Sequence, residues 1–190
     1  MCYTNILHIL DLAQIPLLAK DRVRDMPFVI GGGPCTYNPE PLADFFDLFY
    51  IGEGETSYDA LLDLYKEWKK GDASREAFLH QAAKIPGIYV PSLYEVSYKE
   101  DGTLASMEPV YDDIPKKIEK QVVTELTASV YPDKPVVPFL KVTQDRVVLE
   151  VQRGCIRGCR FCQAGMIYRP LREKDVERLK RQADIMLKNT

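Results

Sequence analysis

The sequence predicts an α/β fold, a class in which helices cover the faces of a mostly parallel sheet. Two short apolar runs, residues 28–30 and 48–51, each end in a glycine turn, as buried parallel strands do. A short helix is expected over 42–46, because prolines are tolerated in the first turn before it. A longer helix is expected from Thr56 or Ser57 through Trp68. The strand–helix–strand–helix order favours a parallel sheet.

The apolar residues of the longer helix share one face at helical spacing, which is most simply read as core. They are Ala60, Leu61, Leu64, Tyr65 and Trp68. The other expected elements are helices over 3–12, 74–84 and 174–188, a hairpin of strands 94–98 and 104–110 around Asp101-Gly102, and a strand over 146–152.

Composition excludes several classes of protein. A chain of 190 residues with 46% hydrophobic residues can bury a core, so global disorder is excluded. A formal charge of −3 argues against a wholesale nucleic-acid binder. No apolar run approaches the length of a membrane span, and the N-terminus lacks the cationic lead-in of a secretory signal. We therefore expect a cytoplasmic chain with no membrane partner.

The sequence also suggests three regions. Pro115, Pro132, Pro135 and Pro138 lie among mixed charges and are typical of a linker or strap. We expect a domain boundary near Gln144. The expected regions are 1–85, an α/β domain, 86–144, a β-hairpin connector, and 145–190, a second domain that begins with a strand and a cysteine-rich loop.

The strongest chemical signal is the spacing of three cysteines. Cys155, Cys159 and Cys162 form the pattern C-x3-C-x2-C directly after the expected strand. Three thiolates can hold three irons of a four-iron cluster and leave the fourth iron open, which suits a catalytic cluster. Gly154 and Gly158 would let the backbone wrap closely around such a cluster and donate N–H groups to its sulfurs.

These residues resemble the radical S-adenosylmethionine (SAM) enzymes, whose signature has this spacing and an aromatic residue before the third cysteine, here Phe161. The longer stretch 153–170 is similar to the branch that carries an N-terminal cobalamin-binding domain. Residues 31–41 and 51–55 are similar to the last two strand-to-loop segments of that domain.

The resemblance implies a set of cofactors and residues. Cys155, Cys159 and Cys162 would hold a 4Fe-4S cluster whose open iron binds SAM, and Phe161 would sit beside the adenine. Cobalamin would contact Gly31, Gly32, Gly33, Gly52, Glu53 and Gly54, although the D-x-H-x-x-G loop of many cobalamin proteins does not occur in the sequence. An electron donor such as a flavodoxin or ferredoxin would be a partner, and the substrate stays open.

The resemblance also implies a fold for each region. Residues 1–85 would be the C-terminal part of a doubly wound, Rossmann-like cobalamin-binding domain, and 145–190 the first βα unit of a radical SAM partial barrel. Since a barrel needs roughly two hundred residues, we expect the chain to be an internal fragment that is inactive alone and only marginally stable.

Two alternatives remain open. A structural zinc site needs four ligands, but the other candidates, Cys2, Cys35, His8 and His80, lie far upstream of the loop. Alternatively, a non-catalytic metal or iron–sulfur module could bind RNA or a protein through residues 153–181, where nine Lys and Arg face three acids. That charge would equally balance the thiolates and the SAM carboxylate, or form a solvated helix face.

Overall fold

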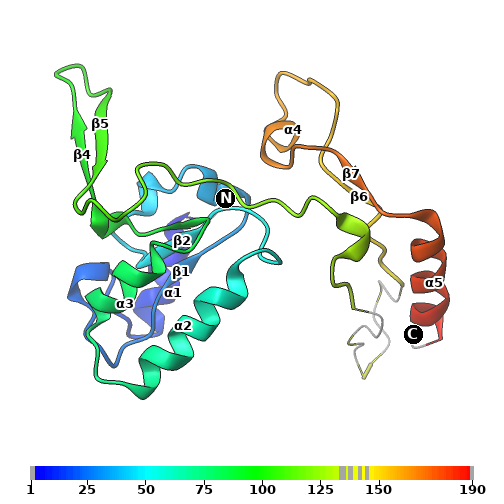
Figure 1. The fold of residues 1–190 in the computed structure, drawn as a ribbon, viewed down its shortest axis with the longest axis horizontal. Helices are drawn as coiled ribbons and strands as arrows, with labels where there is room; N and C mark the ends of the chain where they lie inside the picture. Colours follow the sequence, from blue (N-terminus) through cyan, green and yellow to red (C-terminus); the bar gives the residue numbers. More distant parts are fainter. Residues whose placement is uncertain (1–2, 133–135, 137–138, 141–142, 144–145, 189–190) are drawn as a thin grey trace. The chain divides into compact units, whose positions relative to one another are not determined.

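The computed structural model describes the whole chain except residues 1–2, 133–135, 137–138, 141–142, 144–145 and 189–190 (Figure 1). The chain divides into two compact units, Met1–Val122 and Val123–Thr190, which are described separately. The boundary expected near Gln144 falls outside the described residues. The division into three regions therefore stays a prediction.

The first unit is built on a small mixed sheet with strand order β1-β2-β3. β1 (Ile30–Gly31) pairs in parallel with β2 (Leu48–Tyr50), as the sequence predicts. β3 (Ile88–Tyr89) pairs antiparallel with β2, so the expectation of a parallel sheet is wrong for this edge. An apolar pattern does not indicate the direction of a strand. Here two helices lie between β2 and β3 along the chain.

Three helices belong to this unit. α1 (Tyr3–Leu12) and α3 (Arg75–Ala82) lie where the sequence predicts them, and Ser74 caps α3 by accepting a hydrogen bond from the Ala77 N–H at 3.1 Å. α2 (Tyr58–Lys70) begins after Ser57, whose hydroxyl donates to Pro86 O rather than capping the helix. α2 buries Leu61 fully but leaves Ala60 exposed.

The helix expected over 42–46 is only a single 3₁₀ turn, Glu40–Leu42. The carbonyls that would extend it are used elsewhere in the unit. Asp44 O accepts from Ala19 N at 2.8 Å, and Phe45 O accepts from the Arg22 guanidinium at 2.7 Å. Tertiary contacts therefore outcompete the local helical preference here.

The core of the first unit contains the sheet and the inner faces of α2 and α3. Its buried residues include Phe46, Leu48, Phe49, Leu61, Phe78, Ala82, Ile88, Tyr89 and Val90. Phe28 packs edge-on against Trp68, with ring centroids 5.2 Å apart, and at a tilt against Phe78, with ring centroids 4.5 Å apart. This aromatic contact joins the approach to β1 with both helices.

The predicted hairpin is present. β4 (Tyr94–Tyr98) pairs antiparallel with β5 (Leu104–Pro109), and the two strands project from the rest of their unit (Figure 1). Gly102 at the turn has φ +77°, a conformation that glycine adopts without strain.

In its described residues, the second unit holds short strands, two α-helices and a 3₁₀ turn, Leu126–Ala128. β6 (Gln152–Arg153) pairs antiparallel with β7 (Arg172–Glu173), α4 (Ala164–Ile167) lies between them, and α5 (Val176–Leu187) follows. The strand expected over 146–152 is thus confined to its end, because β7 reaches only Gln152 and Arg153. β6 has an antiparallel neighbour, whereas the first strand of a barrel needs parallel ones.

None of the helices in the described residues has the length and apolar character needed to cross a bilayer.

Candidate cysteine-loop site

The three predicted cysteines lie in one loop, residues 154–171, between β6 and β7. Gly154 starts the loop with φ +88°, and a Cβ there would lie 2.6 Å from Tyr168 O and collide with Pro170 O. Glycine is therefore required at this position, because the start of the loop packs on the backbone of its end. Gly158, by contrast, has open space around it.

The thiols are accessible and are not joined in disulfides. Cys155 and Cys162 are half-buried, and Cys159 is exposed. Arg157 N donates to Cys155 Sγ at 3.4 Å, and Cys162 N donates to Cys159 O at 3.1 Å. The first contact is the kind of N–H to sulfur bond that tunes an iron–sulfur centre.

The loop does not form a finished metal cage. In the part of the chain that the structure describes, no three His, Cys, Asp or Glu side chains gather closely enough to hold a metal ion. The donor set fits a cluster by its chemistry, since three reachable thiols share one loop and one already accepts a backbone N–H. Binding would require the thiols to converge.

The aromatic residue of the motif points into solvent. Phe161 is 92% exposed, and Ile156 and Met166 are exposed on the same loop. An apolar surface of this kind is available to a planar ligand or to another part of a protein.

Sequence reasoning missed a group of charged residues at the base of the loop. Glu150 accepts from Arg153 Nε at 2.7 Å and forms an ion pair with Lys174 Nζ at 3.1 Å. The hydrogen bond from Arg153, together with Lys174, lowers the pKa of the Glu150 carboxyl below its usual value. Arg153 and Lys174 were visible only as part of the basic stretch 153–181, which does not include Glu150, and nothing in their spacing shows that the three residues meet.

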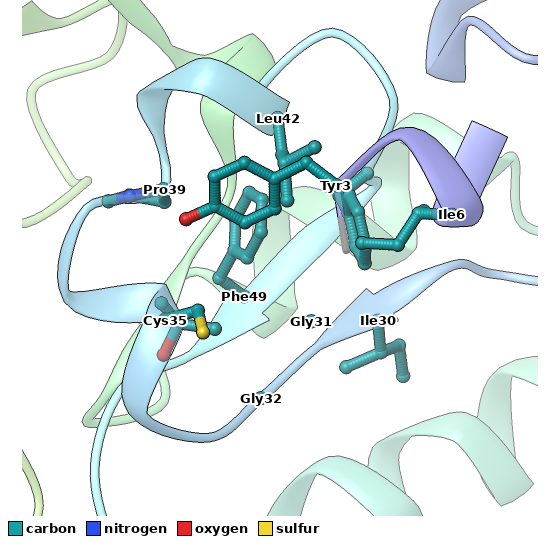
Figure 2. A pocket seen from close by; sticks show the side chains of 11 residues that line it. Tyr3, Ile6, Ile30, Gly31, Gly32, Cys35, Pro39, Leu42 and Phe49 are labelled. Atoms are coloured by element: carbon teal, nitrogen blue, oxygen red, sulfur yellow. The ribbon is translucent and has the colours of Figure 1, made fainter. Parts of the chain in front are cut away.

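The predicted glycine turn after residues 28–30 borders a pocket of about 320 Å³ in the first unit, with Gly31 and Gly32 in its lining (Figure 2). Tyr3 and Ile6 of α1 help to line it, and Cys35 lies in the turn that follows. A Cβ on Gly32 or Gly33 would meet nothing within 4 Å, so the backbone there is open.

The other predicted glycine turn, residues 52–54, contacts another segment of the chain. Gly52 has φ +127° and pairs in parallel with Gln121, whose backbone would collide with a Cβ at Gly52. Glu53 N donates to Gln121 O at 2.9 Å, and Gly54 O accepts from Tyr58 N at the start of α2. The backbone of Gln121 thus occupies the space beside Gly52, and the cobalamin contacts of the six residues stay a prediction through which we derive no chemistry.

A second cavity of about 650 Å³ in this unit is lined by mixed polar groups, among them Glu40, Arg75 and Tyr89. Tyr89 donates to Glu40 Oε1 at 2.6 Å. Burial, reinforced by Glu40, raises the pKa of the Tyr89 phenol. Arg75 instead pairs with Asp47 and donates to the backbone carbonyls of Met26 and Pro27, so the three polar groups have partners within the unit.

Comparison with known proteins supports a radical SAM relation. Residues 1–91 match the family described as "Radical SAM proteins, N-terminal". A curated protein of Methanocaldococcus jannaschii, named "Uncharacterized protein MJ0966", is 29% identical to this chain over 165 residues. That match covers 85% of this chain but only 29% of the relative's length. No solved structure gives a significant match. The family match therefore lies within the first unit, ends before the hairpin, and does not include the cysteine loop.

Proposed function

We propose that this chain is part of a radical SAM enzyme in which Cys155, Cys159 and Cys162 hold a 4Fe-4S cluster. The observation that carries the proposal is the placing of three unoxidised, reachable thiols at C-x3-C-x2-C spacing in one loop. The match of residues 1–91 to a radical SAM family gives independent support.

Different residues of this chain would bind the cluster, stabilise its charge and contact SAM. The three thiols would bind iron, Arg157 N would stabilise the charge on the Cys155 sulfur, and Phe161 would pack against the adenine of SAM. When bound and reduced by a flavodoxin- or ferredoxin-type donor, the cluster supplies one electron that breaks the C5′–S bond of SAM, giving methionine and a 5′-deoxyadenosyl radical. That radical would then take a hydrogen atom from a substrate.

Anaerobic reconstitution with iron and sulfide tests the proposal. We expect roughly four irons and four sulfides per chain, since three thiolates and one open position suit a cubane. Replacing Cys155, Cys159 and Cys162 together with alanine abolishes this uptake, whereas the matched control Cys35→Ala retains it. Equal iron in the triple variant and the wild type would contradict the assignment.

Addition of SAM to the reduced protein tests the open iron. We expect the electron paramagnetic resonance spectrum of the cluster to change, and Phe161→Ala to weaken SAM binding while leaving the iron content unchanged. Uptake of zinc without iron or sulfide would instead support a non-catalytic metal module, for which RNA or a protein is the expected partner.

A further inference from the structure

We propose that Glu150, Arg172 and Lys174 are positioning residues that hold together the two ends of the cysteine loop. With Arg153, we call this group the loop clamp. The inference rests on the proposed function in one respect: what the clamp positions is the set of three cluster-binding thiols.

The backbone alone gives the loop a weak closure. β6 and β7 pair through only two residues each, Gln152 with Glu173 and Arg153 with Arg172. One further backbone bond, from Lys174 N to Val151 O at 2.9 Å, extends the pairing. An isolated two-stranded ladder of this length is marginal in water. Side chains must supply the remaining restraint.

Glu150 restrains the cysteine loop by joining its two ends. Its carboxylate accepts from Arg153, just before the loop, at 2.7 and 3.2 Å, and pairs with Lys174, just after the loop, at 3.1 Å. The Arg153 contacts are two hydrogen bonds to the two carboxylate oxygens, a geometry that fixes direction as well as distance.

Burial of Lys174 makes the loss of its ion pair with Glu150 energetically costly. The Lys174 side chain is only 1% exposed, and its ammonium lies 4.1 Å from the centroid of the Tyr131 ring. A buried cation that loses its carboxylate partner is strongly unfavourable, because an uncompensated charge is then left away from bulk water. The ring contributes a further cation–π attraction. Glu150 and Lys174 therefore hold each other in place.

Arg172 fixes the end of the loop from the other direction. Its guanidinium donates to Tyr168 O at 3.1 Å, to Pro170 O at 2.9 Å and to Val123 O at 2.8 Å. Tyr168 O and Pro170 O are also the atoms against which Gly154 packs. Arg172 thus sets the surface on which the residue before Cys155 rests.

The consequence concerns the cysteines, because ligand geometry depends on supporting residues that do not touch the metal. The clamp defines where the chain enters and leaves the loop, while the three thiols between these points are half-buried or exposed and form no disulfide. We infer that it lowers the cost of ordering the loop when a cluster binds.

The test compares four single variants of this chain. Lys174→Met removes the buried charge, Glu150→Gln removes its partner, and Lys174→Arg keeps the charge. Lys180→Met is the matched control, because Lys180 pairs with Glu177 at 2.8 Å on the exposed side of α5. Amide hydrogen exchange of the metal-free protein is measured first, and iron uptake and the spectrum of the reduced cluster second.

We expect Lys174→Met and Glu150→Gln to speed exchange of residues 154–171 by about tenfold or more, and exchange in α5 by far less. Iron per chain should fall and the spectrum of the remaining cluster should broaden. Lys174→Arg should keep the loop exchange, the iron content and the spectrum close to those of the wild type. Lys180→Met should leave all three unchanged.

The outcomes separate the two proposals. Wild-type exchange of the loop in Lys174→Met would overturn the clamp, and equal acceleration in the loop and α5 would overturn it too, by showing a general loss of stability. Failure of the wild type to take up iron, with the loop response intact, would support the clamp as a loop restraint and overturn the cluster.

Discussion

At Gly52, a close contact with another segment of the chain requires glycine. Its φ of +127° is costly for any side chain, and the backbone of Gln121 occupies the space where a Cβ would be. Gly87, with φ +85°, lies against the side chain of the same glutamine. Two glycines thus accommodate one returning segment at the end of β2.

We expect Gly52→Ala to destabilise the first unit by about 2–4 kcal/mol, from backbone strain and displacement of residue 121. The matched control is Gly71→Ala. Gly71 has φ −101°, and a Cβ there would meet nothing closer than Trp68 O at 3.9 Å, so the change should be about 0.5 kcal/mol or less. Urea unfolding measures both; equal stabilities would show that Gln121 does not need this glycine.

Tyr89 gives a pH-dependent prediction at the same scale. Burial and the nearby Glu40 raise its pKa above the ordinary 10.0, so folding favours the neutral phenol. The stabilisation is complete below pH 10 and is lost progressively as pH rises above that value, where the unfolded chain loses its proton first.

Tyr89→Phe removes both the proton and the 2.6 Å hydrogen bond to Glu40. We expect it to cost about 1 kcal/mol at pH 8 and to reduce the steepness of the alkaline loss of stability. Urea titrations of both proteins between pH 8 and 11 provide the measurement. Parallel curves for the two proteins would show that Tyr89 does not titrate differently on folding.

At the scale of elements, one buried carboxylate organises the approach to the sheet. Asp47, directly before β2, accepts from Arg22 at 2.8 Å, from Arg75 at 2.9 Å and from Val29 N at 2.7 Å. The remaining guanidinium donors bind backbone carbonyls, including Pro16 O and Met26 O. One aspartate therefore ties the segment before β1 and the start of α3 to the sheet.

We expect Asp47→Ala to destabilise the first unit by about 3–5 kcal/mol, because two buried arginines lose their counter-charge. Asp63→Ala is the control, since Asp63 pairs with Lys66 on the exposed surface of α2 and should change stability little. Chemical denaturation followed by the fluorescence of Trp68 reports on this unit. A small effect of Asp47→Ala would mean that the arginines find other partners.

The elements differ in how far sequence could predict them. α1, α2, α3, the hairpin and α5 follow from local periodicity and caps, which need no knowledge of partners. The 3₁₀ turn in place of a helix over 42–46 and the antiparallel β3 depend on distant partners such as Ala19 and Arg22. Tertiary contacts of this kind leave no signature in local pattern.

Part of the candidate site could likewise be predicted from the sequence, and part could not. The positions of Cys155, Cys159 and Cys162 in one loop follow from their spacing. The loop clamp could not be predicted, because Glu150, Arg172 and Lys174 meet only when β6 pairs with β7. The contact of Gly52 could not be predicted for a related reason, since its neighbour Gln121 lies far along the chain.

At the scale of the whole molecule, the chain consists of two units with separate networks of contacts. The ion pairs of Asp47 lie within the first unit and those of Glu150 within the second. Separate cores allow separate unfolding, in contrast to a single cooperative domain.

We therefore expect two distinguishable unfolding transitions. The single tryptophan, Trp68, lies in the first unit, so its fluorescence follows that unit alone. Asp47→Ala should shift the fluorescence transition and leave exchange in the second unit unchanged, while Glu150→Gln should speed exchange of residues 154–171 and leave the fluorescence transition unchanged. A shift of both signals by either variant would show that the units unfold together.

The hairpin described above also has a practical consequence. At its tip, Asp101 Oδ1 accepts from Thr103 N at 2.9 Å and from the Thr103 hydroxyl at 2.6 Å, and a Cβ on Gly102 would meet nothing within 4 Å. The turn is thus held by its own atoms, and exposed turns of this kind tolerate insertions. A short epitope or fluorophore-binding peptide placed after Gly102 would give a handle for isolating the protein with its cysteines untouched.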